Sequence, residues 1–154
     1  MLSDEQAIRL FTFITISFAG ALVLVLLMGV LFLVPGRPIG TTGLALGAAL
    51  AVLSWFGSRA VTAWAADRVA TTRRKGGTGA STEAGSASAR TVAFIGIGVA
   101  EVFGLVGLLA GMAMHDIGPF VVSLPVAVGA VILNASGPGA MRRHLERVRS
   151  GRTD

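Results

Sequence analysis

The sequence predicts an all-α, polytopic membrane protein with four transmembrane helices, arranged as two tandem hairpins with both termini in the cytoplasm. Hydrophobic residues make up 53% of the 154 residues and charged residues only 14%. The apolar residues form uncharged runs that are long enough to cross a bilayer. Lys and Arg residues lie almost entirely on one side of the four predicted crossings. We therefore expect a multi-pass protein of the cell membrane.

The first predicted helix covers residues 10–34. This run contains about 25 uncharged residues. As a helix with a rise of about 1.5 Å per residue, it is longer than the roughly 30 Å thickness of the hydrocarbon core. The run is longer than the roughly 7 to 15 residues of a signal-peptide core, and Asp4 and Glu5 precede it. We therefore expect this helix to remain in the mature protein.

Three further spans are predicted at residues 41–57, 91–114 and 117–136, each bounded by charged residues or by Pro and Gly. Arg59 limits the uncharged length of the first of these, and its glycines lower its helix propensity. Gly is nevertheless common in transmembrane helices, so this segment is retained as a crossing. Pro125 is expected to kink the last span.

The positions of Lys and Arg predict the orientation. Of the 13 cationic residues, only Arg37 falls in a loop on the far side of the four crossings. The positive-inside rule then places both termini and the middle loop in the cytoplasm, and the loops around Arg37 and Asp116 outside. This topology and attraction to anionic lipid headgroups explain the net charge of +5. We therefore expect the lipid bilayer, and no nucleic acid, as a partner.

Three units are predicted along the chain. Residues 1–69 form the first hairpin, residues 70–90 a flexible cytoplasmic linker, and residues 91–154 the second hairpin with a basic C-terminal tail. The linker contains the stretch GGTGASTEAGSASA, in which small and polar residues show no apolar periodicity.

The two hairpins look like an internal duplication. FITISFAG at residues 13–20 aligns with FIGIGVAE at residues 94–101, and both halves continue in step. Two helices per half would give parallel repeats related by an axis along the membrane normal. Chance similarity is the alternative, because Leu, Val, Gly and Ala dominate any membrane helix. In this alignment Glu101 occupies the position of Gly20, so only the second half has a carboxyl group inside a span.

Glu101 is the only ionisable residue inside any predicted span, and it lies near mid-bilayer, about 11 residues after Arg90. A carboxyl group is costly at that depth and indicates a functional site. Burial disfavours its charged form, and no Lys, Arg or His of the chain lies at the same depth. We therefore predict that Glu101 binds a proton or a small cation. A neutral Glu101 hydrogen-bonded across a helix interface is the alternative.

Small residues surround Glu101 on the predicted helix. They leave its carboxyl group accessible and allow another helix to approach closely. The glycines expected to pack around the site are Gly98, Gly104, Gly107 and Gly111. The candidate polar neighbours of Glu101 within the chain are Thr15, Ser17, Ser54 and Asn134.

The segment AEVFGLVGLL, residues 100–109, resembles the carboxylate helix of the proteolipid, or c, subunits of F-type and V-type rotary ATPases. In that family an Ala-Glu pair followed by spaced Gly-Leu elements carries the ion-binding carboxylate at mid-membrane. The resemblance implies that Glu101 binds a proton or sodium ion in a ring that rotates past a stator arginine. Duplicated V-type proteolipids also have four helices, but their carboxylate is on the fourth helix and not on the third.

No catalytic site, metal site or cofactor is expected. The chain has no Cys, which excludes disulfides and thiol chemistry. His115 and Asp116 lack further ligands and predict a solvated turn, and His144, among arginines, is expected at the surface. No nucleophile–base pair or phosphate loop is evident, so we expect no enzyme.

The predicted function is to bind or carry protons or small cations through Glu101. One four-helix chain offers no obvious aqueous route or counter-charge, so we expect a homo-oligomer or a subunit of a membrane complex. The alternative is a non-catalytic accessory or assembly subunit of a larger membrane complex, in which the glycine faces and basic surface helices are contact sites.

Overall fold

The protein is all-helical in a computed structural model that describes residues 4–29, 36, 38–75 and 82–150. The helices are α1 (Asp4–Met28), α2 (Thr41–Lys75), α3 (Thr82–Met114), α4 (Gly118–Ala130) and α5 (Pro138–Ser150), with a π-helical segment, η2 (Val131–Ser136), between α4 and α5. The predicted all-α class is therefore confirmed. The predicted end of the first span, residues 30–34, lies outside the described residues.

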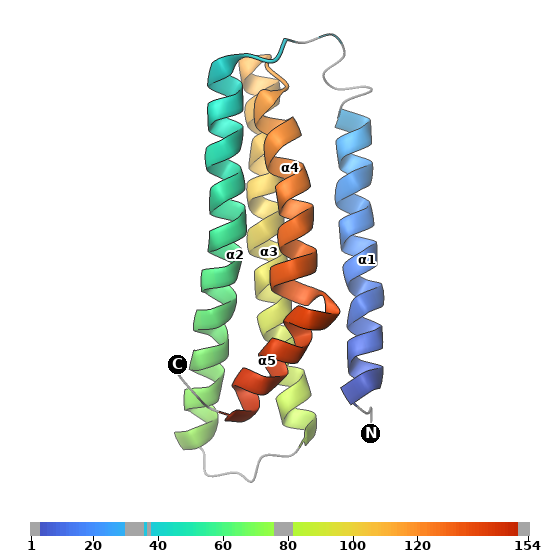
Figure 1. Cartoon of the computed structure of the whole chain (residues 1–154), viewed down its shortest axis with the longest axis vertical. Coiled ribbons are helices and arrows are strands. Elements are labelled where there is room, and N and C mark those ends of the chain that lie inside the picture. The colour runs from blue at the N-terminus through green and yellow to red at the C-terminus, as the bar shows by residue number, and fades with distance from the viewer. Residues whose placement is uncertain (1–3, 30–35, 37, 76–81, 151–154) are drawn as a thin grey trace.

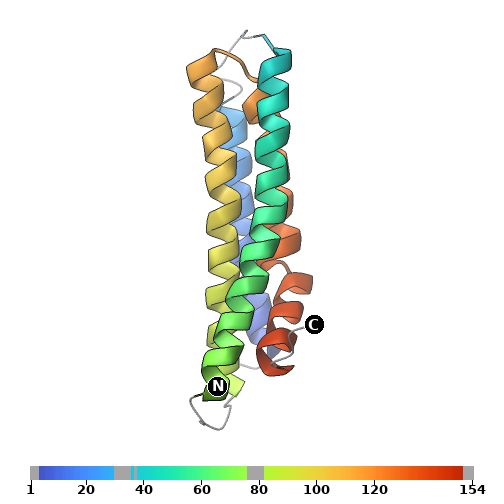
Figure 2. The ribbon, with the colours of Figure 1, turned by 90° about the vertical axis from the view of Figure 1, so that its left-hand side faces the viewer.

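Three long apolar helical stretches lie side by side in the bundle (Figures 1 and 2). The stretches Thr41–Thr72, Ala87–Met114 and Gly118–Val148 are each long and apolar enough to cross a membrane, and Thr12–Val25 in α1 is a shorter apolar helix. These lengths and compositions are compatible with a membrane location and suggest a small membrane protein.

Helix α1 lies on the flank of the bundle. In Figure 1 it stands on the side opposite α2, with α3 and α4 between them, and it packs mainly against α4, η2 and α5. Leu22 of α1 belongs to the main hydrophobic cluster with Ile97, Phe120 and Leu124, and Phe18 packs against that cluster. In the described residues, α1 and α2 therefore do not pack along each other.

Glycine residues let α2, α3 and α4 approach one another closely. A Cβ atom on Gly47 of α2 would lie 2.8 Å from the carbonyl oxygen of Gly118, and one on Gly104 of α3 would lie 2.8 Å from Cδ1 of Leu124. Ala127, which also faces Gly104, is fully buried. Such small-residue contacts are typical of helices that associate in membranes.

The chain changes direction at the end of η2. Gly137 is extended, with a ψ of 165°, as expected for a residue that precedes a proline. Pro138 then begins α5, a position that suits its fixed φ and missing N–H group. Helix α4 continues through Pro125, and the sharp change of direction lies at Gly137 (Figure 1).

The predicted linker, residues 70–90, is helical where the structure describes it. Helix α2 continues to Lys75 and α3 begins at Thr82, whereas residues 76–81 lie outside the described residues. Ala89 is fully buried and forms a cluster with Ala93, Met141 and Leu145. Packing of the first turns of α3 against α5 explains why small residues that suggested a flexible linker form a helix instead.

Asp116 joins the turn between α3 and α4 to the start of α2. Both of its carboxylate oxygens lie 3.1 Å from the backbone nitrogen of Gly40, and Oδ1 accepts a 2.8 Å hydrogen bond from the backbone nitrogen of Gly118. N–H groups at helix starts lack partners within the helix, and a carboxylate satisfies them and complements the helix dipole. Asp116 is only 8% exposed, so the prediction of a solvated turn is wrong for this residue.

Replacing Asp116 by Ala should lower the free energy of unfolding by about 1–3 kcal/mol, because the N–H groups of Gly40 and Gly118 lose their acceptor. Circular dichroism of the purified protein during chemical unfolding in detergent micelles measures the change. Asp67→Ala is the matched control, because the carboxylate of Asp67 on α2 has no hydrogen bond or ion pair with a side chain that the structure describes. Equal stability of the two variants would show that the Asp116 contacts do not stabilise the fold.

Candidate functional site

Glu101 lies near the middle of α3. The apolar stretch Ala87–Met114 extends about 20 Å on either side of it, at about 1.5 Å per residue. Its side chain is partly buried. With the residues whose side chains the structure describes, its carboxyl group makes no hydrogen bond or ion pair. The interhelical hydrogen bond considered as the alternative is therefore not formed with any of these residues.

The side of α3 that carries Glu101 is where the core of the bundle meets its outer surface. Ile97, one turn earlier, is 2% exposed and belongs to the hydrophobic cluster that includes Leu22 of α1. Leu105, one turn later, is 42% exposed, and the adjacent Val102 is 56% exposed. The side chain of Glu101 is thus partly covered by neighbouring residues of the chain and partly exposed on the outer surface of the bundle.

The predicted glycines around Glu101 fall on two different faces of α3. Cβ atoms on Gly104, Gly107 and Gly111 would lie, respectively, 2.8 Å from Cδ1 of Leu124, 3.0 Å from the carbonyl oxygen of Pro119 and 2.9 Å from the carbonyl oxygen of Asp116. These three glycines therefore pack against α4 and the turn before it. Gly98 is exposed, and a Cβ atom there would have no neighbour within 4 Å. It leaves an open position one turn from Glu101.

The polar residues considered as neighbours of Glu101 bond elsewhere. Ser54 donates a 3.3 Å hydrogen bond to the carbonyl oxygen of Ala100, and Ser17 donates one of 3.0 Å to the carbonyl oxygen of Phe13. Asn134 donates a 3.1 Å bond from Nδ2 to the carbonyl oxygen of Trp55. Hydroxyl and amide groups in helices often bond to backbone carbonyls in this way. The side chain of Thr15 is outside what the structure describes.

Sequence reasoning missed a second polar region, where α5 folds back onto η2. His144 is only 3% exposed, and its Nε2 lies 3.0 Å from the carbonyl oxygen of Ala135. The surface position expected for this residue is therefore wrong. The spacing in the sequence indicates this burial, because His144 lies three residues after Met141 and four before Val148, on the apolar face of an amphipathic helix.

Comparison with known proteins identified no relative: no family model, curated protein or solved structure matches the chain. The resemblance of residues 100–109 to the proteolipid carboxylate helix therefore stays a prediction from those residues. In the part of the chain that the structure describes, no group of three or more His, Cys, Asp and Glu residues could hold a metal ion.

Replacing Gly107 by Ala should lower the free energy of unfolding by about 1–3 kcal/mol, because the added methyl group would overlap Oγ of Ser123 and press on the Pro119 carbonyl. Gly98→Ala on the same helix is the control and should leave stability unchanged or slightly raised, since that position is open. Chemical unfolding of both variants in the same detergent measures the difference. A Gly98→Ala protein that is as destabilised as Gly107→Ala would contradict the assignment of the two faces.

Proposed function

We propose that this chain is a small multi-pass membrane protein, proteolipid-like in its carboxylate helix, in which Glu101 binds or carries protons or small cations. The observation that supports this most directly is the position of Glu101 at the centre of the apolar stretch Ala87–Met114, without an ion pair or hydrogen bond to a side chain that the structure describes. A charged carboxylate in apolar surroundings is costly unless it is compensated. A bound proton, or a cation that shares its ligands with water or another subunit, supplies that compensation.

The proposed topology has four crossings as two tandem hairpins, with α1 as the first crossing and both termini in the cytoplasm. The start of α1, the end of α2, the start of α3 and the whole of α5 lie at the same end of the bundle (Figures 1 and 2). Arg9, Arg68, Arg90 and Arg142 belong to these segments. This clustering of cations at one end supports a cytoplasmic orientation of that end.

The proposed working form is a homo-oligomer or a complex with another membrane subunit. Glu101 is partly open to the surroundings of the bundle, and Gly98 leaves room for a second helix one turn away. Close approach of a helix at a glycine is a common way for membrane helices to associate. A partner helix at this position would enclose the carboxyl group and provide further ligands for a proton or cation.

An accessory or assembly subunit of a larger membrane complex is the second candidate function. The same open surface supports it, because Val102, Leu105 and Leu109 beside Gly98 are 56%, 42% and 63% exposed. In this alternative the surface binds a partner helix, and Glu101 is a neutral hydrogen-bonding group within the contact. The exchange of ions is then not a property of the protein.

Glu101→Gln keeps the size and hydrogen-bonding capacity of the side chain but cannot bind and release a proton. We expect exchange of protons or sodium ions across vesicles that contain this variant to fall to the level of protein-free vesicles. Its free energy of unfolding should stay within about 1 kcal/mol of that of the unmodified protein, because no hydrogen bond or ion pair with a side chain that the structure describes is lost. A pH-sensitive dye and radioactive sodium measure the two kinds of exchange.

Glu146→Gln is the control for this experiment, because it removes an exposed carboxylate from α5. Its exchange rate should equal that of the unmodified protein. If Glu101→Gln exchanges ions as fast as the unmodified protein, Glu101 is not the ion-binding group. A membrane protein that co-purifies with both the unmodified protein and this variant, with no ion exchange in any sample, would favour the accessory function.

A further inference from the structure

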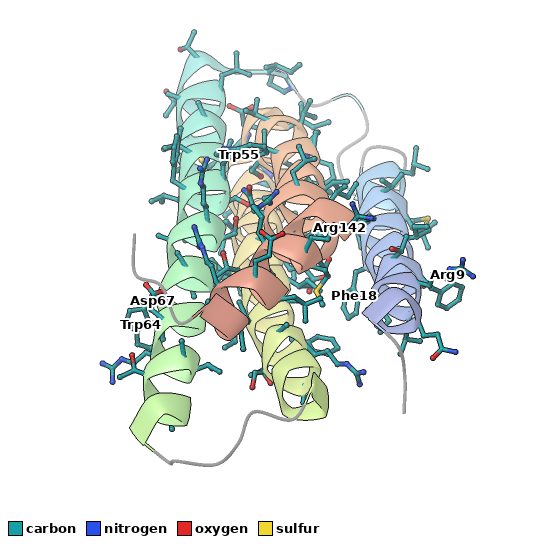
Figure 3. All side chains as sticks on the ribbon, turned by 60° about the horizontal axis from the view of Figure 1, so that its bottom comes forward. Arg9, Phe18, Trp55, Trp64, Asp67 and Arg142 are labelled. Carbon is teal, nitrogen blue, oxygen red and sulfur yellow. The ribbon has the colours of Figure 1, made fainter. Side chains whose placement is uncertain are left out.

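A polar pocket lies beside η2, where three helical segments meet. Its volume is about 350 Å³, and it is lined by Arg59 and Thr62 of α2, Leu133 and Asn134 of η2, and Arg143, His144 and Arg147 of α5. Figure 3 shows α5 folded back across α2 and α3. The volume falls within the range of roughly 300 to 1,000 Å³ that is typical of small-molecule sites.

The lining of the pocket is strongly cationic. Arg59 approaches from α2, whereas Arg143 and Arg147 lie one turn apart on α5, and none of the lining residues is acidic. Nη2 of Arg143 donates a 2.6 Å hydrogen bond to the carbonyl oxygen of Leu133, which fixes this guanidinium at the pocket. Guanidinium groups bind phosphate oxygens through paired hydrogen bonds. Three of them converging from two helices therefore favour a ligand with a phosphate group.

His144 provides an independent indication of a ligand. The carbonyl oxygen of Ala135 can only accept a hydrogen bond, so Nε2 of His144 is the donor in their 3.0 Å contact. The other ring nitrogen, Nδ1, is buried and has no hydrogen-bond partner in the described structure. Buried polar atoms nearly always have a partner. A ligand hydroxyl could donate to Nδ1 of the neutral ring, and a phosphate oxygen could accept from the charged ring.

The depth of the pocket matches that of lipid phosphates in the proposed topology. Arg59 lies about 27 Å along α2 from Thr41, at about 1.5 Å per residue, and the hydrocarbon core is roughly 30 Å thick. The pocket is therefore close to the boundary between the hydrocarbon core and the headgroups, on the cytoplasmic side. Basic pockets between helices at this level are suited to anionic headgroups.

We propose that this pocket is a binding site for a phosphate group, carried either by an anionic phospholipid or by a soluble phosphate ester. The arginines hold the phosphate oxygens, and His144 bonds to a further ligand oxygen. The bound ligand would join α2 to α5 across η2 and stabilise the fold of α5 against the bundle. This site does not involve Glu101, so it stands independently of the proposed ion binding.

The test compares Arg59→Gln/Arg147→Gln with Arg68→Gln/Arg142→Gln. Each double variant removes one exposed arginine from α2 and one from α5, but Arg68 and Arg142 do not line the pocket. Arg68 lies over the ring of Trp64, and Figure 3 shows Arg142 on the side of α5 toward α1. Native mass spectrometry of the full chain in detergent micelles, with circular dichroism as a check of folding, measures binding of phosphatidylglycerol, phosphatidylcholine and glycerol 3-phosphate.

We expect phosphatidylglycerol to bind more tightly than phosphatidylcholine, and the pocket variant to lose about 30-fold in affinity. The control variant should lose at most about threefold, because Arg68 and Arg142 do not line the pocket and act on the ligand only over a distance at which salt screens them. Binding of glycerol 3-phosphate alone, with the same dependence on Arg59 and Arg147, would support the site with a soluble ligand as its source. Equal losses in the two variants, or no binding of either phosphate compound, would overturn the proposal.

A second measurement uses the unmodified protein, so it does not depend on the folding of a variant. Phenylglyoxal modifies accessible arginines, and peptide mass spectrometry locates the products. The bound phosphate compound should slow the modification of Arg59 and Arg147 at least several-fold relative to that of Arg68 and Arg142. Equal rates at all four arginines in the presence of the ligand would contradict the pocket as the binding site.

Discussion

The close packing of α2, α3 and α4 is the constraint on which the rest of the structure depends. Gly47 lets α2 approach the start of α4, and Gly104 and Gly107 let α3 approach the middle of it. In the proposed bilayer, lipid tails are as apolar as the helices, so packing and hydrogen bonds must hold the helices together. Asp116 stabilises one end of the bundle, because its carboxylate accepts hydrogen bonds from backbone N–H groups at the starts of both α2 and α4.

Both candidate sites lie where this packing stops. Ala100 is completely buried in the main cluster, whereas the next residue, Glu101, lies at its edge beside the open surface at Gly98. At the cationic pocket, the regular α-helix α4 is followed by η2. The carbonyl oxygens of Leu133 and Ala135 in η2 accept hydrogen bonds from side chains of α5. Such π-helical segments are often found at functional sites. The fold thus leaves a carboxyl group and a cationic pocket at the margins of a densely packed core.

Local signals in the sequence predicted some helix boundaries but not others, since the predicted span 41–57 ends well before α2 does, at Lys75. Two predicted boundaries, Thr41 at the start of a span and Met114 at the end of another, coincide with the ends of α2 and α3, because Pro, Gly and charged residues mark those ends. The position of α1 could not be predicted in this way, since it depends on which distant surfaces fit together. Around Glu101, the sequence predicted the close contacts at Gly104 and Gly107, but spacing alone could not show that Gly98 faces outward.

Side chains with mixed character were the hardest to place. The small residues before Arg90 suit both a flexible linker and a helix, and contact of Ala89 with α5 decides in favour of the helix. His144 has charged neighbours in the sequence but lies on the apolar face of α5. It is buried because that face packs against the bundle. Both positions depend on how α5 packs: Ala89 contacts α5, and His144 of α5 contacts η2. The direction of α5 is set at Gly137.

Chemical modification of Glu101 by a carbodiimide in bilayers, across a range of pH and located by peptide mass spectrometry, tests the central claim most directly. The reagent reacts with protonated carboxyl groups and favours apolar surroundings, so it reports both protonation and access. We expect selective labelling of Glu101 that decreases as the pH is raised, and protection when a competing cation binds. No labelling of Glu101 at any pH would contradict an accessible, proton-binding carboxyl group.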